Sequence, residues 1–300
     1  MFERILVPLD GSELAESILI QVRRLLMVKD AEIRLLKVVT LPPSAEADAG
    51  TPLDLLWSRA AEYLKGVEDR LASQGARVSL KVVEGFPANA ILETAKKERS
   101  TMIAMSTHGR TGLSRWVFGS VTEKVLRASP IPVLAVPSFA GMGGEAFPTG
   151  RRELPFRKIL IPIAAADLSL EAVPAVLEFA RLFGGQVLLV HVCEGPECSV
   201  QVPQMKEAYE LLRKAGVVVE PLMKKGDPAT QILQTCREAA ADLIAMTTHG
   251  HSGPSRWVLG SVAEKVLRAA QVPLLVVRTV QEHGRLSETA VEALEFHSDP

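Results

Sequence analysis

The stretch THGRTGLSRWVFGSV at residues 107–121 returns as THGHSGPSRWVLGSV at residues 248–262, which is an offset of 141 positions. An alignment of residues 101–136 with residues 242–277 needs no gap and gives 23 identities in 36 positions. A repeat of this kind indicates two copies of one domain in a single chain. The length of 300 residues agrees, because it suggests two domains of about 150 residues each.

The composition is that of an ordinary globular chain, with 47% hydrophobic and 23% charged residues. A net charge of −1 gives no electrostatic reason to expect nucleic acid or an anionic membrane as a partner. No apolar run approaches the ~20 residues of a membrane span, and residues 1–8 are too short and too soon charged for a signal sequence. We therefore predict a cytoplasmic protein with no membrane insertion.

The three cysteines, Cys193, Cys198 and Cys236, all lie in the second half. An odd and sparse set indicates reduced thiols in a reducing compartment. The alternative is a redox pair of Cys193 and Cys198, although their spacing is not the two-residue spacing of redox helices.

Apolar runs alternate with amphipathic stretches in both halves, which predicts an α/β fold with parallel sheets and right-handed crossovers. In the first half we expect strands at 5–9, 33–39, 78–83, 102–105 and 133–136, and helices near 12–28, 54–73, 87–98 and 119–128. In the second half we expect strands near 158–163, 186–193, 217–223, 242–247 and 273–277. The predicted domains are residues 1–137 and 157–278, with a linker at 138–156 and a tail at 279–300.

The repeated glycine-rich stretch is the predicted binding loop. It follows the fourth strand of each half and ends at Gly119-Ser120 or Gly260-Ser261, where a helix begins. Ligands of parallel sheets lie beyond the carboxyl ends of the strands, and a helix N-terminus offers unpaired N–H groups that suit phosphate. The alternative is that Gly119-Ser120 is only a helix cap within a long connection.

Asp10 follows the first strand and is the candidate carboxylate of this edge. A carboxylate here suits a ribose hydroxyl or a metal on phosphates, and the alternative is that Asp10 caps the first helix. In the second half Ala164 stands where Asp10 stands, and Asp167 comes three residues later. The second site therefore lacks this carboxylate.

These residues resemble the universal stress protein family. The resemblance covers about 1–137 and 157–278 and rests on Ile5–Ser12, on Gly226–Ala229 with a looser match at Gly85–Ala88, and on Gly119–Arg127. It implies two tandem Rossmann-like domains of the adenine nucleotide hydrolase type, each a five-stranded parallel sheet flanked by helices. It also implies that the domains pair along their fifth strands as a pseudo-dimer within the chain.

Some family members bind ATP through a fingerprint of Gly, two residues, Gly, nine residues, Gly and then Ser or Thr. The first copy has Ser106 in place of the first glycine and then matches at Gly109, Gly119 and Ser120. The second copy has Thr247 in that place and then matches at Gly250, Gly260 and Ser261. A small hydroxyl residue therefore replaces the first glycine in both copies.

The resemblance implies an ATP site in the first domain and a weaker one in the second. Asp10 would meet the ribose or a phosphate-bound Mg²⁺, Val38 would line the adenine pocket, and Gly119 and its successors would hold the phosphates. The first site comprises Pro8, Leu9, Asp10, Val38, Met105, Ser106, His108, Gly109, Arg110, Gly119, Ser120 and Val121. The second comprises Val192, Thr247, His249, Gly250, Gly260 and Ser261. Any Mg²⁺ would arrive with the nucleotide, since no dedicated metal site is visible.

We expect an ATP-binding stress-response or regulatory protein that holds nucleotide mainly in the first domain, with the second domain degenerate. Its partner would be an unknown protein, and the tandem chains would form a homodimer. The sequence shows no nucleophile–base pair and no catalytic carboxylate pair, so a dedicated enzyme is not expected and any ATP hydrolysis would be slow. The alternative, favoured by Ser106, Thr247 and Ala164, is a nucleotide-free scaffold that acts through protein contacts.

Overall fold

The computed structural model describes residues 2–26, 31–40, 53–107, 119–137, 156–164, 167–193, 202–247 and 259–278. The chain divides into two compact units, Met1–Pro155 with Leu267–Leu275 and Phe156–Val266 with Val276–Pro300. All of the predicted linker except residue 156, and the whole of the predicted tail, lie outside the described residues. The domain boundaries and the pairing of the two domains stay predictions.

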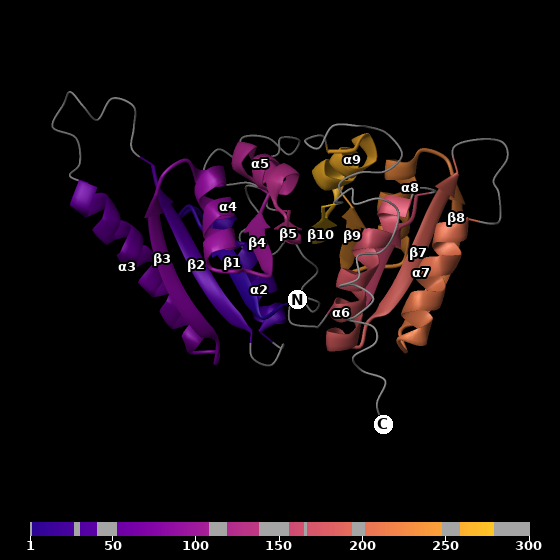
Figure 1. Cartoon of the computed structure of the whole chain (residues 1–300), viewed down its shortest axis with the longest axis horizontal. Coiled ribbons are helices and arrows are strands. Elements are labelled where there is room, and N and C mark those ends of the chain that lie inside the picture. The colour runs from indigo at the N-terminus through magenta and orange to yellow at the C-terminus, as the bar shows by residue number, and fades with distance from the viewer. Residues whose placement is uncertain are drawn as a thin grey trace. The chain divides into compact units, whose positions relative to one another are not determined.

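The first half forms a doubly wound parallel sheet (Figure 1). Its strands are β1 (Arg4–Pro8), β2 (Glu32–Val39), β3 (Arg77–Glu84), β4 (Met102–Ser106) and β5 (Val133–Val136), in the order β3-β2-β1-β4-β5. Its helices are α1 (Glu13–Glu16), α2 (Ile18–Leu25), α3 (Leu53–Ala72), α4 (Pro87–Lys97) and α5 (Ser120–Ala128). The predicted α/β class and parallel sheet are confirmed.

Continuous apolar runs place the central strands in the core. Ile5, Leu6 and Val7 of β1 are fully buried, and every residue of β4 is buried. Strands that are buried on both faces are expected where helices cover a parallel sheet from both sides. Helix α3 packs on β2 and β3, whereas α4 lies beside α5.

The second half repeats this plan. Its strands are β6 (Lys158–Pro162), β7 (Gln186–Cys193), β8 (Val218–Lys225), β9 (Leu243–Thr247) and β10 (Leu274–Val277), in the order β10-β9-β6-β7-β8. Its helical elements are η1 (Asp167–Ala172, a 3₁₀ helix), α6 (Val173–Phe183), α7 (Pro203–Lys214), α8 (Pro228–Glu238) and α9 (Ser261–Ala269). No described helix is long and apolar enough to cross a membrane.

The first helical stretch differs from its prediction. Ser12 is its N-cap, as a hydroxyl at that position favours, and its Oγ accepts a hydrogen bond from the Ala15 amide at 3.1 Å. The helix then breaks at Ser17, whose Oγ donates to the Leu14 carbonyl at 2.7 Å. A side chain that bonds to a nearby carbonyl competes with the helical pattern. The second half has alanine at the position of Ser12, and there η1 replaces α1.

The prediction of reduced thiols is wrong for one cysteine. Cys193, the last residue of β7, is disulfide-bonded. Cys236 is a free, buried thiol, and its burial raises its pKa to about 11. Cys198 lies outside the described residues.

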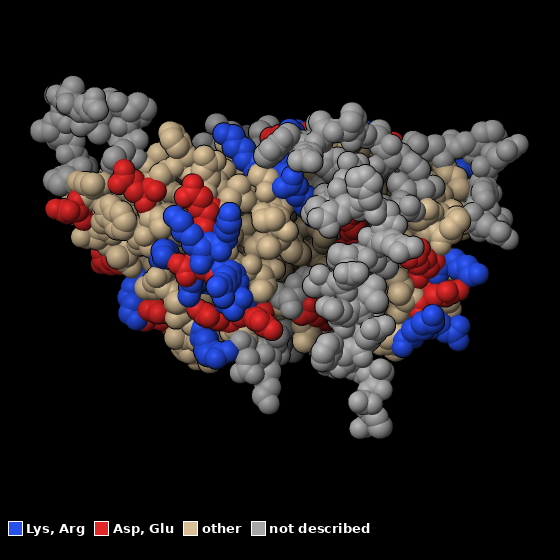
Figure 2. Space-filling view, in the orientation of Figure 1, with Lys and Arg blue, Asp and Glu red and all other residues tan. Residues whose placement is uncertain are grey.

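Acidic and basic side chains are interleaved on the described part of the face in Figure 2, where neither sign forms a broad continuous patch. The best-connected group is an ion-pair network of Glu98 with Arg34 and Lys81, in which the Lys81–Glu98 distance is 2.6 Å. The hydrogen bond from Lys81 is the main cause of the lowered pKa of Glu98. On the described part of this face, the charges do not form the basic stripe that is typical of a nucleic-acid interface.

The matching helices α4 and α8 begin differently. Asp227 caps α8, and its Oδ1 accepts hydrogen bonds from the Thr230 amide at 3.0 Å and the Thr230 hydroxyl at 2.7 Å. Phe86 occupies the matching position of α4, is 78% exposed and makes no capping hydrogen bond. The first half therefore lacks a helix cap that the second half has.

We predict that Phe86→Asp stabilises the protein by about 1 kcal/mol, because it supplies an N-cap where the backbone is already extended. Asp227→Ala should destabilise it. The hydrogen bonds from Thr230 lower the pKa of Asp227, so this stabilisation is present above the unfolded-state pKa and is lost as the pH falls through the folded-state pKa. Urea unfolding of both variants at neutral and acidic pH measures these effects. If the stability lost in Asp227→Ala became larger as the pH falls, the assignment of ionised Asp227 as the stabilising N-cap would be contradicted.

Candidate functional site

The carboxyl ends of β1, β2 and β4 bring the candidate residues to one edge of the first sheet. Ile5 pairs with Met102, and Pro8 pairs with Leu36. Continued along the strands, this register puts Asp10 level with Thr107 on one side and with Val38 on the other. The reversal of strand order between β1 and β4 makes this edge the expected ligand site of an open parallel sheet.

Asp10 is held in a defined direction by the turn that follows β1. Its Oδ1 accepts hydrogen bonds from the Ser12 amide at 2.9 Å and the Ser12 hydroxyl at 2.6 Å. Gly11 between them has a φ of +86°, a conformation that glycine adopts at little cost. The alternative that Asp10 caps the first helix is wrong, because Ser12 is the cap and Asp10 orients it.

The N-terminus of α5 presents backbone donors beside the end of β4. Gly119 is the N-cap; its amide donates to the Thr107 carbonyl at 3.0 Å, and its carbonyl accepts from the Glu123 amide at 3.0 Å. The next three amides, of Ser120, Val121 and Thr122, have no acceptor inside a helix, and the N-cap residue, Gly119, has no side chain that could cap them. Ser12 and Asp227 cap α1 and α8 with their side chains, so this helix start differs from those two.

Thr122, which is not among the residues predicted from the sequence, joins α5 to β4. It is 3% exposed, and its Oγ1 donates to the Ser106 carbonyl at 3.0 Å. This bond joins the first turn of α5 to the last residue of β4 and so fixes the amide donors relative to the sheet. The sequence repeat contains a sign of this difference, because Thr122 aligns with Ala263, which has no hydroxyl group.

The other predicted residues of the first site are placed as follows. Leu9, Met105 and Ser106 are buried, Pro8, Asp10, Val38, Gly119 and Val121 are half-buried, and Ser120 is exposed. His108, Gly109 and Arg110 lie outside the described residues. The structure therefore brings the strand ends and the helix start together, and the glycine loop stays a prediction.

The second half has the same frame with fewer polar groups. The Ile163 amide donates to the Val190 carbonyl at 2.8 Å, as Leu9 does to Leu36. Ala164 replaces Asp10, and Ala263 replaces Thr122. Val192, Thr247, Gly260 and Ser261 occupy the expected ends of β7 and β9 and the start of α9, whereas His249 and Gly250 lie outside the described residues.

His191 on β7 is hydrogen-bonded to the backbone. Its Nδ1 lies 2.8 Å from the Ile163 carbonyl oxygen. Across the described ranges of both halves, no group of three or more His, Cys, Asp or Glu residues could hold a metal ion.

Comparison with known proteins shows which family this sequence and fold match. A model of the universal stress protein family matches residues 1–137 and 155–278. The chain is 33% identical over 140 residues to universal stress protein MJ0531 of Methanocaldococcus jannaschii, covering 45% of this chain and 82% of that one. It is 26% identical over 221 residues to universal stress protein Rv2005c of Mycobacterium tuberculosis, covering 69% and 71%.

The fold agrees with a solved structure along almost its full length. The crystal structure of a universal stress protein from Archaeoglobus fulgidus covers 93% of this chain and 97% of its own, with a TM-score of 0.73 and 24% identity. Because the family model matches both halves, the chain belongs to the universal stress protein family as a tandem, two-domain member.

Proposed function

We propose that this protein is an ATP-binding regulator that holds the nucleotide at the carboxyl edge of β1, β2 and β4, with a degenerate site in the second half. The observation that carries the proposal is the N-terminus of α5. Its N-cap, Gly119, has no side chain to accept from its amides, and the Thr122–Ser106 bond fixes them at the end of β4. Such a helix start favours phosphate through its N–H groups and its dipole.

Asp10 and Val38 supply the other end of the proposed site. Asp10 lies between the phosphate-binding helix start and Val38 in the register of the sheet. Its carboxylate is oriented by Ser12 and is suited to a ribose hydroxyl or to Mg²⁺ on the phosphates. Val38 is half-buried at the end of β2, which suits an apolar contact with the adenine ring.

The replacement of the first fingerprint glycine does not argue against this proposal. A serine with a positive φ would be strained, but Ser106 ends β4 and Thr247 ends β9 in extended conformation. Neither is among the described non-glycine residues with positive φ, which are Arg99 and Ala240. The backbone at this position therefore accepts a residue with a side chain.

Two substitutions favour the first half over the second. Ala164 removes the carboxylate, and Ala263 removes the hydroxyl that joins the helix to β4. A hydrogen bond to a charged group contributes roughly 1.5–3 kcal/mol, so the loss of the carboxylate alone costs about one to two orders of magnitude in affinity. We propose a homodimer of tandem chains, a cytoplasmic location, an unknown protein partner and at most slow hydrolysis as parts of the same hypothesis.

We predict that Gly119→Asp abolishes ATP binding. A carboxylate at the N-cap would accept hydrogen bonds from the first N–H groups of α5, and its negative charge would repel the phosphates. Isothermal titration with Mg-ATP should show a loss of at least about 100-fold in affinity, or about 2.7 kcal/mol. Gly260→Asp is the matched control and should leave most of the binding intact. Equal losses in the two variants would contradict the asymmetry between the halves.

The role of Asp10 in nucleotide binding can be separated from its role in the structure of the turn. Asp10→Asn keeps an oxygen that can accept from Ser12 and should preserve the melting temperature while it weakens Mg-ATP binding by about tenfold or more. Asp10→Ala should weaken binding and also lower the melting temperature, since the turn loses its acceptor. Unchanged affinity in a folded Asp10→Asn protein would exclude a role for this charge.

A further inference from the structure

The turn that carries Asp10 runs directly into a helix of a single turn. Asp10 Oδ1 accepts hydrogen bonds from the amide and the hydroxyl of Ser12, and the Ser12 carbonyl accepts one from the Glu16 amide at 3.1 Å. Helix α1 has only four residues, Glu13–Glu16. A helix this short is not stable alone, because its few hydrogen bonds do not offset the cost of nucleation. The geometry of the Asp10 turn therefore depends on the contacts that α1 makes with other elements.

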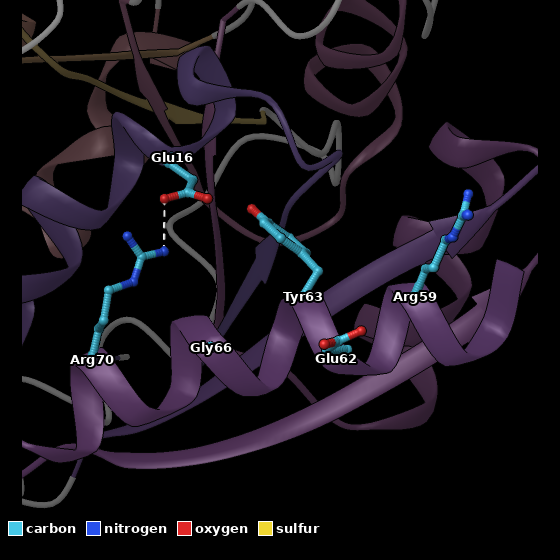
Figure 3. Close-up of a pocket in the computed structure, with 6 residues that line it drawn as sticks. All are labelled: Glu16, Arg59, Glu62, Tyr63, Gly66 and Arg70. Carbon is cyan, nitrogen blue, oxygen red and sulfur yellow. Dashed lines mark hydrogen bonds and ion pairs between the residues drawn. The ribbon is translucent and has the colours of Figure 1, made fainter. Parts of the chain in front are cut away.

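Glu16 joins the end of α1 to α3. Arg70 Nη2 lies 2.7 Å from Glu16 Oε2, and Figure 3 shows this ion pair connecting the two helices. The side chain of Arg70 is 57% exposed and that of Glu16 is 25% exposed. An ion pair as accessible as this one contributes little to the stability of the fold. Its main effect is therefore to set the position of α1 against α3.

Tyr63 of α3 faces the same carboxylate from within the fold. Its side chain is directed toward Glu16 (Figure 3), and its hydroxyl oxygen is buried. Burial first, and then the negative charge of Glu16, raise the pKa of Tyr63, and the charge of Asp10 adds to this shift. The protonated hydroxyl is therefore within electrostatic range of both carboxylates. Lys37 Nζ of β2 lies 5.0 Å from the centroid of the tyrosine ring, a cation–π contact that helps to fix the ring.

The second half has no counterpart of this group of side chains. The aligned residues are Leu170 for Glu16, Gln204 for Tyr63 and Leu211 for Arg70. The alignment of α3 with α7 is supported by burial, because Leu64, Val67 and Leu71 match Met205, Ala208 and Leu212, which are all buried.

The loss of this group goes together with the loss of the candidate carboxylate. The second half builds the same five-stranded sheet without it, so the fold does not require these side chains. The second half is also the half in which Ala164 replaces Asp10. The group therefore accompanies the carboxylate of the proposed site and is dispensable for the frame.

We propose that Glu16, Tyr63 and Arg70 form a positioning network that holds the Asp10 turn in the geometry that the nucleotide requires. This inference rests on the proposed function, since Asp10 is the group that the network places. Arg70 and Tyr63 fix the Glu16 carboxylate, and the backbone bond from Glu16 to Ser12 passes this constraint to the turn. The three residues act through Asp10 without touching the nucleotide.

Hydrogen exchange of the Ser12 amide tests the network without any ligand. This amide donates to Asp10 Oδ1, and its protection reports how often the turn opens. Glu16→Leu, which introduces the aligned residue of the second half, should speed its exchange by about tenfold or more in a protein that stays folded. Glu13→Leu is the matched control, because Glu13 is an exposed residue of the same helical turn, and it should leave this exchange unchanged.

The affinity for Mg-ATP shows whether the network acts through Asp10. Arg70→Leu and Tyr63→Phe should each weaken binding by about threefold or more, whereas Arg70→Lys keeps the ion pair and should retain most of the affinity. In an Asp10→Asn background, Glu16→Leu should cause little further loss, because a positioning residue acts only through the group that it places.

Two results would overturn this inference. One is unchanged exchange of the Ser12 amide in folded Glu16→Leu protein. The other is a loss of affinity from Glu16→Leu that is as large in the Asp10→Asn background as in the wild type. A wild-type chain that does not bind Mg-ATP would instead contradict the proposed function, and the exchange measurement would still decide whether the network holds the turn.

Discussion

The parallel pairing of β1 with β4 is the constraint on which the candidate site depends. These strands lie almost 100 residues apart in the sequence, yet Ile5 pairs with Met102 and Leu6 pairs with Ile103. The pairing exists because the chain builds outward from β1 to β3 and then crosses back to the other side of β1. It sets the Asp10 turn beside the end of β4, and the Thr122–Ser106 bond adds the start of α5 to the same edge. A shift of one residue in this register would separate the carboxylate from the helix amides.

The two halves share the residues that build the frame and differ in residues assigned to the proposed site. Both keep the buried strands, the glycine at the start of the last helix and the hydroxyl residue at the end of the fourth strand. The second half lacks the carboxylate and the hydroxyl group found at the carboxyl edge of the first sheet, because Ala164 and Ala263 replace Asp10 and Thr122. It is also the half in which η1 replaces a capped α-helix. A fold whose core tolerates such losses can keep its packing while one of two equivalent edges ceases to bind, because folding and ligand recognition depend on different residues.

Most of the fold could be predicted from the sequence, because long apolar runs and glycine or proline boundaries are local signals. The predicted strand at 33–39 differs from β2 (Glu32–Val39) by one residue, and Pro87 opens α4 as expected. The break at Ser17 was missed because it depends on a side chain that bonds to its own helix. Thr122 was missed because its partner carbonyl is 16 positions away. The disulfide state of Cys193 also runs against the expectation from composition.

The central claim is that one of two homologous edges binds ATP. The most direct measurement is to purify the protein without added nucleotide, denature it, and identify and count the released small molecules by chromatography and mass spectrometry, with a parallel sample that has first been saturated with Mg-ATP. The account predicts about one ATP or ADP per chain in the saturated sample, since only the first half has both the carboxylate and the helix start. Two nucleotides per chain would contradict the degeneracy of the second half, and none after saturation would contradict nucleotide binding altogether.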